Sequence, residues 1–350
     1  MTDVHTDITQ FRGSHDDFGY AQGRALQGSA ILKNRQAGWR IRKPRFHIAE
    51  EEVKSAFRQF APGIWEELLG LSEGLDMPLK DVLRDFGHYR VNWVPSGCSI
   101  LTGSDFLVRN YDYHPLTYDG RFSFFQPTDQ GYAIAGPASR VTGRMDGMNE
   151  QGLVMGYNFM QRRKPGDGFI SPMIGRMILE TCATVDDAIH LLREIPHRGS
   201  FSYVVLDRYE RTYVIEASPR SVSVRESQTC TNHFELLQHE NRHHLVDSKR
   251  REQIIEQKAA ESIEPHDAFR LMNDKDRDVF SDLYKSWAGT IHTAAYFPKD
   301  LKVWFALGGD QDPAVFDFAA WLQGTPITAK QIQGKLDTQL GLANTQPYGS

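Results

Sequence analysis

The stretch PSGCSILTGSDFLVRNYDY, residues 95–113, marks the point where the sequence changes character. Before it, Ala, Gln, Leu and Arg recur at helical spacing, whereas after it short apolar runs are separated by Gly, Asn and Asp. Within it, Gly103-Ser104-Asp105 predicts a turn between two strands, Cys98–Leu101 and Phe106–Tyr113. The sequence therefore predicts a helical segment that extends to about Asn92, followed by a hairpin that begins at Cys98.

The rest of the chain repeats these two patterns. The spacing of apolar residues predicts helices at residues 18–41, 49–71 (with a kink near Pro62), 79–91, 172–181, 185–195, 247–260 and 266–273. It predicts strands at residues 98–101, 106–113, 122–126, 132–135, 152–159, 202–207, 212–217, 222–225, 290–297 and 302–307. Helices in blocks and strands joined by hairpins are typical of an α+β fold with helices layered on antiparallel sheets.

Composition narrows the class of protein. The chain has 350 residues, of which 40% are hydrophobic and 24% charged, as in globular proteins with a substantial core. A net charge of -5 provides no basic field for nucleic acid or an anionic membrane, and no apolar run is long enough to span a bilayer. The first residues lack the features of a signal peptide, and three cysteines are too few for a disulfide framework. We therefore expect a cytoplasmic protein, and a homo-oligomer is left open.

Cys98 has two interpretations. A free cysteine is ordinarily a small core residue. However, the preceding Gly97 permits a backbone geometry that an attack by sulfur on the preceding carbonyl would need. The hairpin would also return Arg109 and Asp112 to Cys98, where a guanidinium favours thiolate and a carboxylate can hold an ammonium. The sequence thus favours a nucleophile.

Several motifs in order along the chain resemble one family. They are Gly97-Cys98-Ser99, Val108-Arg109-Asn110-Tyr111-Asp112, Asp146-Gly147-Met148-Asn149-Glu150-Gln151-Gly152-Leu153, Gly156-Tyr157-Asn158-Phe159, Thr231-Asn232 and Ser248-Lys249-Arg250-Arg251. Together they resemble the choloylglycine hydrolase and penicillin acyltransferase group, cysteine enzymes that act on linear amide C–N bonds. Phe11-Arg12-Gly13-Ser14 and Gly19-Tyr20-Ala21-Gln22-Gly23 are similar to the leader of the penicillin acyltransferase branch.

The resemblance implies a four-layer αββα sandwich of the N-terminal-nucleophile hydrolase type. It implies a helical leader or pro-segment, residues 1–97, that is cut off after Gly97, and a catalytic domain, residues 98–350. Cys98 would then be the nucleophile, with Arg109 and Asp112 beside it. Asn158 and Asn232 would contribute to the oxyanion site, and a further arginine would be Arg251, or Arg250 if the register slips by one. The long leader differs from the bile-salt hydrolase branch and points away from bile acids.

The chemistry can be stated without the family. A free α-amino group has a pKa of about 7.7–8.0, so the amine of an N-terminal cysteine can act as the base for its own thiol. Attack on an amide would give a thioester and release an amine, and amide donors would stabilise the oxyanion. Water or a second amine would resolve the thioester, and the sequence leaves this choice open. The expected substrate is a small N-acyl amide, with no cofactor and no metal.

Other residues keep plainer interpretations. Asn149 fits a hairpin turn, Glu216 a structural hydrogen-bonding partner as well as a site residue, and Cys182 and Cys230 the core. A group of aromatic residues could line an apolar acyl pocket or fill the layer between the sheets. These are Tyr113, Phe122, Phe124, Phe125, Tyr157 and Phe159.

One motif offers a competing function. His239-Glu240-Asn241-Arg242-His243 matches H-E-x-x-H, which on a helix places two histidines on one face for zinc, with glutamate as base. The motif requires a stable helix, whereas this segment is polar almost throughout and Asn241 is a poor helix former. A zinc metallopeptidase is therefore the alternative to the cysteine enzyme, and a loop is expected here.

Overall fold

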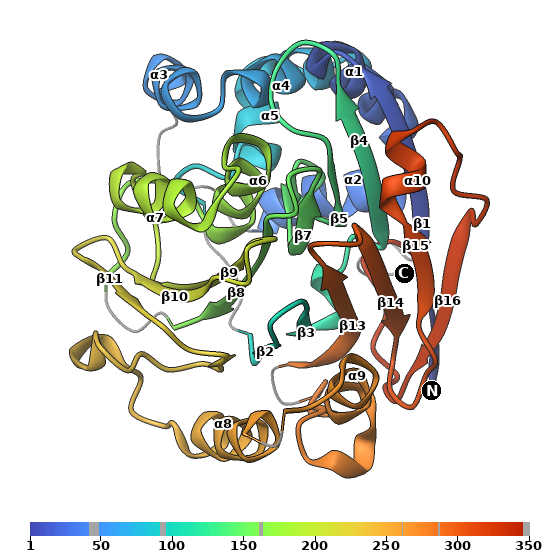
Figure 1. The fold of residues 1–350 in the computed structure, drawn as a ribbon. Coiled ribbons are helices and arrows are strands. Elements are labelled where there is room, and N and C mark those ends of the chain that lie inside the picture. The colour runs from blue at the N-terminus through green and yellow to red at the C-terminus, as the bar shows by residue number, and fades with distance from the viewer. Residues whose placement is uncertain (42–48, 92–95, 161–163, 261, 286–287, 346–350) are drawn as a thin grey trace.

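Two β-sheets pack face to face in the computed structural model, which describes residues 1–41, 49–91, 96–160, 164–260, 262–285 and 288–345 (Figure 1). The ten-stranded sheet has the order β11-β10-β9-β8-β7-β5-β4-β1-β16, with β6 paired to β5. Its strands are β1 (Thr2–Gly13), β4 (Arg121–Pro127), β5 (Ile134–Ser139), β6 (Gly143–Arg144), β7 (Asp146–Asn149), β8 (Val154–Phe159), β9 (Phe201–Leu206), β10 (Thr212–Ala217), β11 (Val222–Arg225) and β16 (Gln331–Leu336).

The six-stranded sheet carries the predicted hairpin. Its order is β12-β2-β3-β13-β14-β15, and every neighbouring pair is antiparallel. Its strands are β2 (Ser99–Thr102), β3 (Leu107–Tyr113), β12 (Thr229–Cys230), β13 (Gly289–Phe297), β14 (Lys302–Leu307) and β15 (Ala314–Asp317). Cys98 lies directly before β2, so the strand predicted from Cys98 begins one residue later than expected.

Helices cover the outer faces of the two sheets (Figure 1). They are α1 (His15–Leu26), α2 (Ala30–Ile41), α3 (Glu50–Phe60), α4 (Pro62–Leu75), α5 (Leu79–Phe86), α6 (Ser171–Thr181), α7 (Val185–Glu194), α8 (Val246–Ala259) and α9 (Pro265–Asn273). The short α10 (Phe318–Leu322) instead packs Phe318 and Trp321 into the cluster between the sheets. Three apolar clusters separate the layers. One joins α1 and α3–α7 to the large sheet, one fills the space between the sheets, and one joins the small sheet to α8 and α9. The layers are thus helix, sheet, sheet and helix, and the predicted α+β class is confirmed.

The predicted helices are mostly present, with shifted ends. The kink expected near Pro62 is a full break, because Pro62 begins α4 directly after α3 ends at Phe60. The helix predicted at residues 18–41 is two helices, and the one predicted at residues 79–91 ends at Phe86. The segment near residue 132 forms its strand slightly later, at β5.

The prediction of a helical leader over residues 1–97 is wrong for its first residues. Thr2–Gly13 forms β1, which lies inside the large sheet, parallel to β4 and antiparallel to β16. Val4, Thr6 and Ile8 alternate with more exposed neighbours, so the strand has the period-two pattern of a sheet with one covered face. The first residues of the chain are therefore part of the sheet that carries β7 and β8.

The helices α1 and α4 approach each other closely because glycines face the contact. A Cβ at Gly19 would overlap the backbone carbonyl of Glu67, and one at Gly70 would overlap the carbonyl of Asp16. This packing orients the leader helices over the large sheet. None of the helices in the described part of the chain is both long and apolar enough to cross a bilayer.

We predict that Gly19→Ala lowers the free energy of unfolding by about 1–3 kcal/mol, because the new methyl group forces two helix backbones apart. Urea denaturation followed by circular dichroism measures this change. The control is Arg24→Ala on the exposed side of the same helix, which should stay within about 0.5 kcal/mol of the parent. An equally stable Gly19→Ala chain would contradict the close approach.

Candidate active site

Cys98 is fully buried at the start of the small sheet. Its Sγ atom accepts hydrogen bonds from Nη2 of Arg109 at 3.3 Å and from the backbone N–H of Asp112 at 3.4 Å. Both partners lie on β3, which pairs with β2 in antiparallel register. The hairpin therefore brings together the three residues that the sequence predicted to meet.

The Arg109 side chain crosses from the small sheet to the large one. Its Nη1 donates to the carbonyl oxygen of Met145 at 3.0 Å and to Oδ2 of Asp146 at 2.6 Å. Its Nη2 donates to the carbonyl oxygen of Tyr157 at 2.5 Å, in addition to Cys98. The guanidinium is wholly buried, so these contacts replace the water that it lost on folding.

Asp146 anchors this arginine and is a site residue that sequence reasoning did not single out. Besides Arg109, its carboxylate accepts hydrogen bonds from the Tyr296 hydroxyl and from Nε2 of His292 at 3.3 Å, both on β13. Burial alone would raise the pKa of Asp146, but the His292 bond and the nearby positive charge hold it below its ordinary value. The only sequence signal was a carboxylate within a motif that was otherwise assigned to a turn.

Asp112 lies on the other face of β3, because Arg109 and Asp112 are three positions apart on an alternating strand. Its Oδ1 accepts a hydrogen bond from the Thr290 hydroxyl at 2.7 Å, whereas its Oδ2 is buried with no hydrogen-bond partner among the described residues. Burial raises the pKa of Asp112 to about 7, against the opposing charges of Arg251 and Arg109. Arg109 and Asp112 thus flank Cys98 from opposite faces of the sheet.

Arg251, on α8, reaches the backbone of the nucleophile. Its Nη1 donates to the carbonyl oxygen of Cys98 at 3.0 Å and to Oγ of Ser99 at 2.5 Å, and its Nη2 donates to Oδ1 of Asn232 at 2.9 Å. Arg250 instead points outward, with its side chain 47% exposed, and pairs with Asp247 and Asp278. Of the two candidate arginines, the structure brings Arg251 to Cys98.

The two predicted oxyanion asparagines lie in the same network. Asn158 on β8 follows Tyr157, and its Nδ2 donates to the carbonyl oxygen of Cys230 at 2.9 Å. Asn232 donates to the carbonyl oxygen of Phe159 at 3.0 Å while it accepts from Arg251. Each amide thus has a hydrogen bond to a backbone carbonyl, and their role as oxyanion donors stays a prediction.

The surroundings of Cys98 favour the thiol over the thiolate. Burial raises the pKa of Cys98 above its ordinary value, and the charge of Arg109 opposes that effect without overcoming it. The expectation that Arg109 would favour thiolate is right in sign, but it is outweighed by desolvation.

The residues given plainer interpretations are structural. Asn149 accepts hydrogen bonds from the N–H groups of Gln151 and Leu153, which forms the expected hairpin turn. The carboxylate of Glu216 accepts three backbone N–H groups in the segment that follows Phe234. Cys182 and Cys230 are buried and form no disulfide.

The aromatic residues divide between two layers. Tyr113, Phe122 and Phe124 lie between the sheets, and Phe125, Tyr157 and Phe159 lie in the cluster beneath the leader helices.

The zinc-peptidase alternative is wrong, because it requires an α-helix at residues 239–243 and the structure has none there. Gln238–Glu240 is a single 3-10 turn, and no α-helix carries the two histidines, which are both exposed. Glu240 is buried and bound to Arg220, Ser200 and Ser218, so it is not available as a base. The segment is the loop that its polarity predicts.

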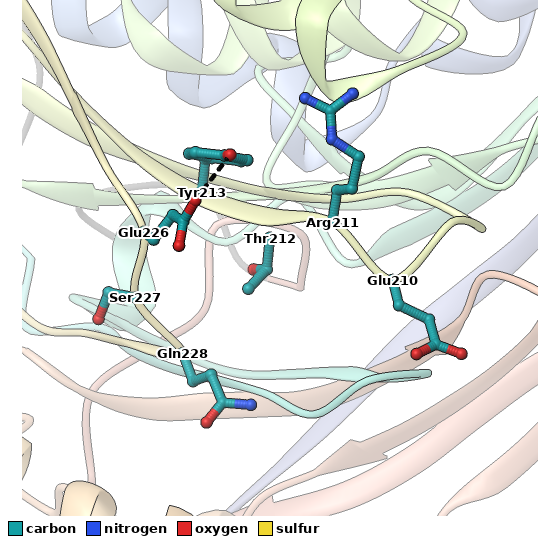
Figure 2. Close-up of a pocket in the computed structure, with 7 residues that line it drawn as sticks. All are labelled: Glu210, Arg211, Thr212, Tyr213, Glu226, Ser227 and Gln228. Atoms are coloured by element: carbon teal, nitrogen blue, oxygen red, sulfur yellow. Dashed lines mark hydrogen bonds between the residues drawn. The ribbon is translucent and has the colours of Figure 1, made fainter.

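A surface pocket of about 520 Å³ lies apart from this network (Figure 2). Its lining residues are Glu210, Arg211, Thr212, Tyr213, Glu226, Ser227 and Gln228. The Tyr213 hydroxyl donates to Glu226 at 2.9 Å, and Arg211 pairs with Asp186 outside the pocket. None of the predicted catalytic residues lines this pocket, so it is not the candidate active site.

The model of one protein family matches this chain. It is that of acyl-coenzyme A:6-aminopenicillanic acid acyl-transferase, and it matches residues 101–312. Since this is more than half of the 350 residues, the chain belongs to that family. The match includes Arg109, Asp112 and Arg251, and it begins just after Cys98.

Solved structures show distant likenesses. A variant of conjugated bile acid hydrolase from Clostridium perfringens has 11% identity and a TM-score of 0.46, over 64% of this chain and 93% of that one. Penicillin V acylase from Agrobacterium tumefaciens has 12% identity and a TM-score of 0.41, over 63% and 84%. The Caenorhabditis elegans ortholog of N-acylethanolamine-hydrolyzing acid amidase has 12% identity and a TM-score of 0.38, over 58% and 93%. No curated protein matches the chain, and the family assignment rests on the family model.

Arg250 and Arg251 are neighbours on α8, and they allow a matched test of the contacts that Arg251 makes with Cys98 and Asn232. We predict that Arg251→Ala lowers the free energy of unfolding by about 2–4 kcal/mol, because it leaves the Cys98 carbonyl and the Asn232 amide without their buried donor. Arg250→Ala should change it by less than about 0.5 kcal/mol, since that side chain is half exposed. Chemical denaturation of both variants measures the difference, and equal effects would contradict the assignment.

The raised pKa of Asp112 predicts a pH dependence of stability. Between about pH 4 and pH 7 the folded chain holds a proton on Asp112 that the unfolded chain has lost, so stability falls as pH rises, by up to about 1.4 kcal/mol per unit. Asp112→Asn should remove that fall, because the amide does not titrate. Denaturation across this range, in a Cys98→Ala background that excludes sulfur chemistry, measures the slope. Asp105→Asn in the exposed hairpin turn is the control, and a slope unchanged by Asp112→Asn would refute the prediction.

Proposed function

We propose that this chain is a cysteine amide hydrolase or acyltransferase of the N-terminal-nucleophile type, activated when it cuts itself between Gly97 and Cys98. The observation that carries the proposal is the Arg109 guanidinium, which lies 3.3 Å from the Cys98 sulfur while Asp146 holds it in place. A buried thiol with a dedicated cation differs from Cys182 and Cys230, for which no charged hydrogen-bond partner is found among the described residues. This difference supports Cys98 as the reacting cysteine.

The cut would follow an N-to-S acyl shift. The sulfur attacks the Gly97 carbonyl, the C–N bond to Cys98 breaks, and the nitrogen gains the proton that the thiol lost. Water then hydrolyses the resulting thioester and leaves a carboxylate on Gly97 and a free amine on Cys98. Arg251, bound to the Cys98 carbonyl, would hold the residue in register during both steps.

The new amine would complete the active site. An α-amino group has a pKa of about 7.7–8.0, so it can take the thiol proton near neutral pH. The partnerless oxygen of Asp112 could then accept a hydrogen bond from this amine and so orient it. In this scheme Arg109 stabilises the thiolate, and the Asn158 and Asn232 amides stabilise the oxyanion by about 3 kcal/mol per donor.

The reaction would then run on a small N-acyl amide. Sulfur attacks the amide carbonyl, the leaving amine takes a proton from the α-ammonium, and the acyl group remains on Cys98 as a thioester. Hydrolysis follows when water attacks, and transfer follows when a second amine attacks. The buried aromatic side chain of Tyr113, which lies with Cys98 in the cluster between the sheets, favours a hydrophobic acyl group. Unpaired cysteines suit a reducing compartment such as the cytoplasm.

We predict that the purified chain separates under denaturing conditions into fragments of residues 1–97 and 98–350, and that Cys98→Ala stays whole and inactive. Intact-mass analysis and N-terminal sequencing measure the cut, and a panel of N-acyl amides and penicillins measures activity. Under native conditions the two fragments should elute together, because β1 is paired to β4 and β16.

Cys230→Ala is the matched control, since this cysteine is equally buried and lies on the neighbouring strand β12. It should cut and react as the parent does. A large fragment that begins at any residue other than Cys98, or a Cys98→Ala chain that still cuts, would refute the mechanism.

A further inference from the structure

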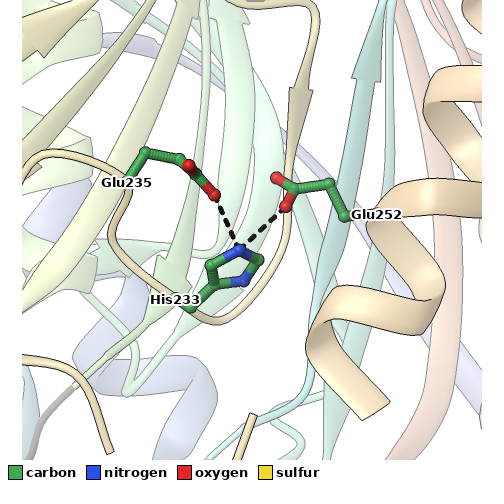
Figure 3. Close-up of side chains that lie close together, drawn as sticks. All are labelled: His233, Glu235 and Glu252. Carbon is green, nitrogen blue, oxygen red and sulfur yellow. Dashed lines mark ion pairs between the residues drawn. The ribbon is translucent and has the colours of Figure 1, made fainter. Parts of the chain in front are cut away.

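The side chains of one histidine and two glutamates lie close together beside Arg251 of α8. Nε2 of His233 lies 2.8 Å from Oε1 of Glu235 and 2.8 Å from Oε2 of Glu252 (Figure 3). His233 and Glu235 come from the loop after β12, and Glu252 comes from α8. The His233 and Glu252 side chains are 3% and 10% exposed, whereas Glu235 is 44% exposed, so the cluster opens to solvent on one side.

From this geometry we propose that His233, Glu235 and Glu252 form a binding site for a divalent transition metal of the zinc class. One imidazole nitrogen and two carboxylate oxygens, all within 4.8 Å of one another, are a donor set that Zn²⁺ accepts, with water as a fourth ligand on the open side. Two carboxylates and a neutral imidazole also balance the charge of a divalent ion. The proposal does not depend on the chemistry at Cys98.

The surrounding hydroxyls orient the imidazole so that its Nε2 atom faces the two carboxylates. The Thr231 hydroxyl donates to the Ser248 carbonyl at 3.0 Å, and the Ser248 hydroxyl donates to Oγ1 of Thr231 at 3.0 Å. When both hydroxyl hydrogens are used in this way, Nδ1 of His233, 2.9 Å from Oγ of Ser248, acts as a donor to Ser248. A second ring nitrogen that donates to a buried oxygen is the usual support of a metal-bound histidine, and it turns the Nε2 atom toward the carboxylates.

The ligand spacing requires only a small adjustment. Zinc–ligand bonds of about 2.0–2.2 Å in a tetrahedral arrangement separate ligand atoms by roughly 3.3 Å, which is about half an ångström more than the two distances in the cluster. Glu235 can supply its part of this movement, because it lies on a loop with its side chain 44% exposed. The Glu252 carboxylate has to move back from Nε2 of His233 by the same amount.

The site is continuous with the catalytic network through the chain itself. Asn232, which accepts from Arg251, immediately precedes His233, and Arg251 immediately precedes Glu252. The Ser248 hydroxyl accepts from the N–H of Asn232 at 2.7 Å as well as from His233. A bound metal would therefore tie α8 to the loop that carries Asn232 and would stabilise both against unfolding.

The test is a zinc titration of the chelator-treated, dialysed full chain by isothermal calorimetry, with the melting temperature followed in parallel. One Zn²⁺ should bind per chain and raise the melting temperature, and Co²⁺ in its place should give the absorption of a tetrahedral site. Glu252→Gln, Glu235→Gln and His233→Asn should each weaken binding at least tenfold. The asparagine at position 233 keeps a donor for Ser248 while it removes the Nε2 ligand, and circular dichroism checks that each variant is folded.

Two controls separate this site from other ligands. The double variant His239→Ala/His243→Ala removes exposed histidines of the neighbouring loop and should bind zinc as the parent does. Cys98→Ala should also keep one Zn²⁺ per chain, whatever happens to the proposed cut. An absence of zinc binding, binding that survives the ligand variants, or binding lost with His239 and His243 would overturn the proposal. The first of these outcomes would leave His233 as the cation of a simple ion pair.

Discussion

The Arg109 guanidinium, buried between two sheets, is the constraint on which the site depends. An arginine cannot give up its charge, so its burial requires acceptors close to the guanidinium. Asp146 and the backbone carbonyls of Met145 and Tyr157 accept from its two terminal nitrogens, and Cys98 does so from the small sheet, whereas Nε has no partner among the described residues. Tyr296 and His292, both on β13 of the small sheet, in turn donate hydrogen bonds to the Asp146 carboxylate. Arg109 and Asp146 thereby join the two sheets by hydrogen bonds, and the sulfur lies at this contact.

The same burial affects the two titratable groups next to the proposed cut. Desolvation raises the pKa of both the Cys98 thiol and the Asp112 carboxyl, so each is held toward its neutral state. A cationic amine beside them would favour both anions at once. The α-amine that the proposed cut would release therefore acts against the effect of burial on both groups.

Turn residues and the spacing of apolar residues predicted those elements whose conformation depends mainly on residues nearby in the sequence. The hairpin from Cys98 to Tyr113 follows from its turn and its alternation, and it brought Arg109 to the sulfur as expected. The strand β1 was missed because its polar residues do not form a strong alternating pattern, and only its neighbours in the sheet, more than 100 residues away, stabilise it. The role of Asp146 was missed for the same reason, since its partners lie on β3 and β13. Arg251 could be separated from Arg250 only once α8 had an orientation.

The position of β1 changes what a cut after Gly97 can mean. A detachable pro-segment would pack on the outside of a finished domain, whereas residues 2–13 are an internal strand of the sheet that holds Asp146 and Tyr157. Glu67 of α4 also pairs with the buried Arg176 of α6, so the leader supplies a charge that the rest of the core needs. Removal of the leader would expose the sheet and take away one of the two carboxylates that pair with the buried Arg176, leaving Glu180 as the other. Cleavage in this fold is therefore better understood as the making of one new chain end within an unchanged core than as the removal of a cover.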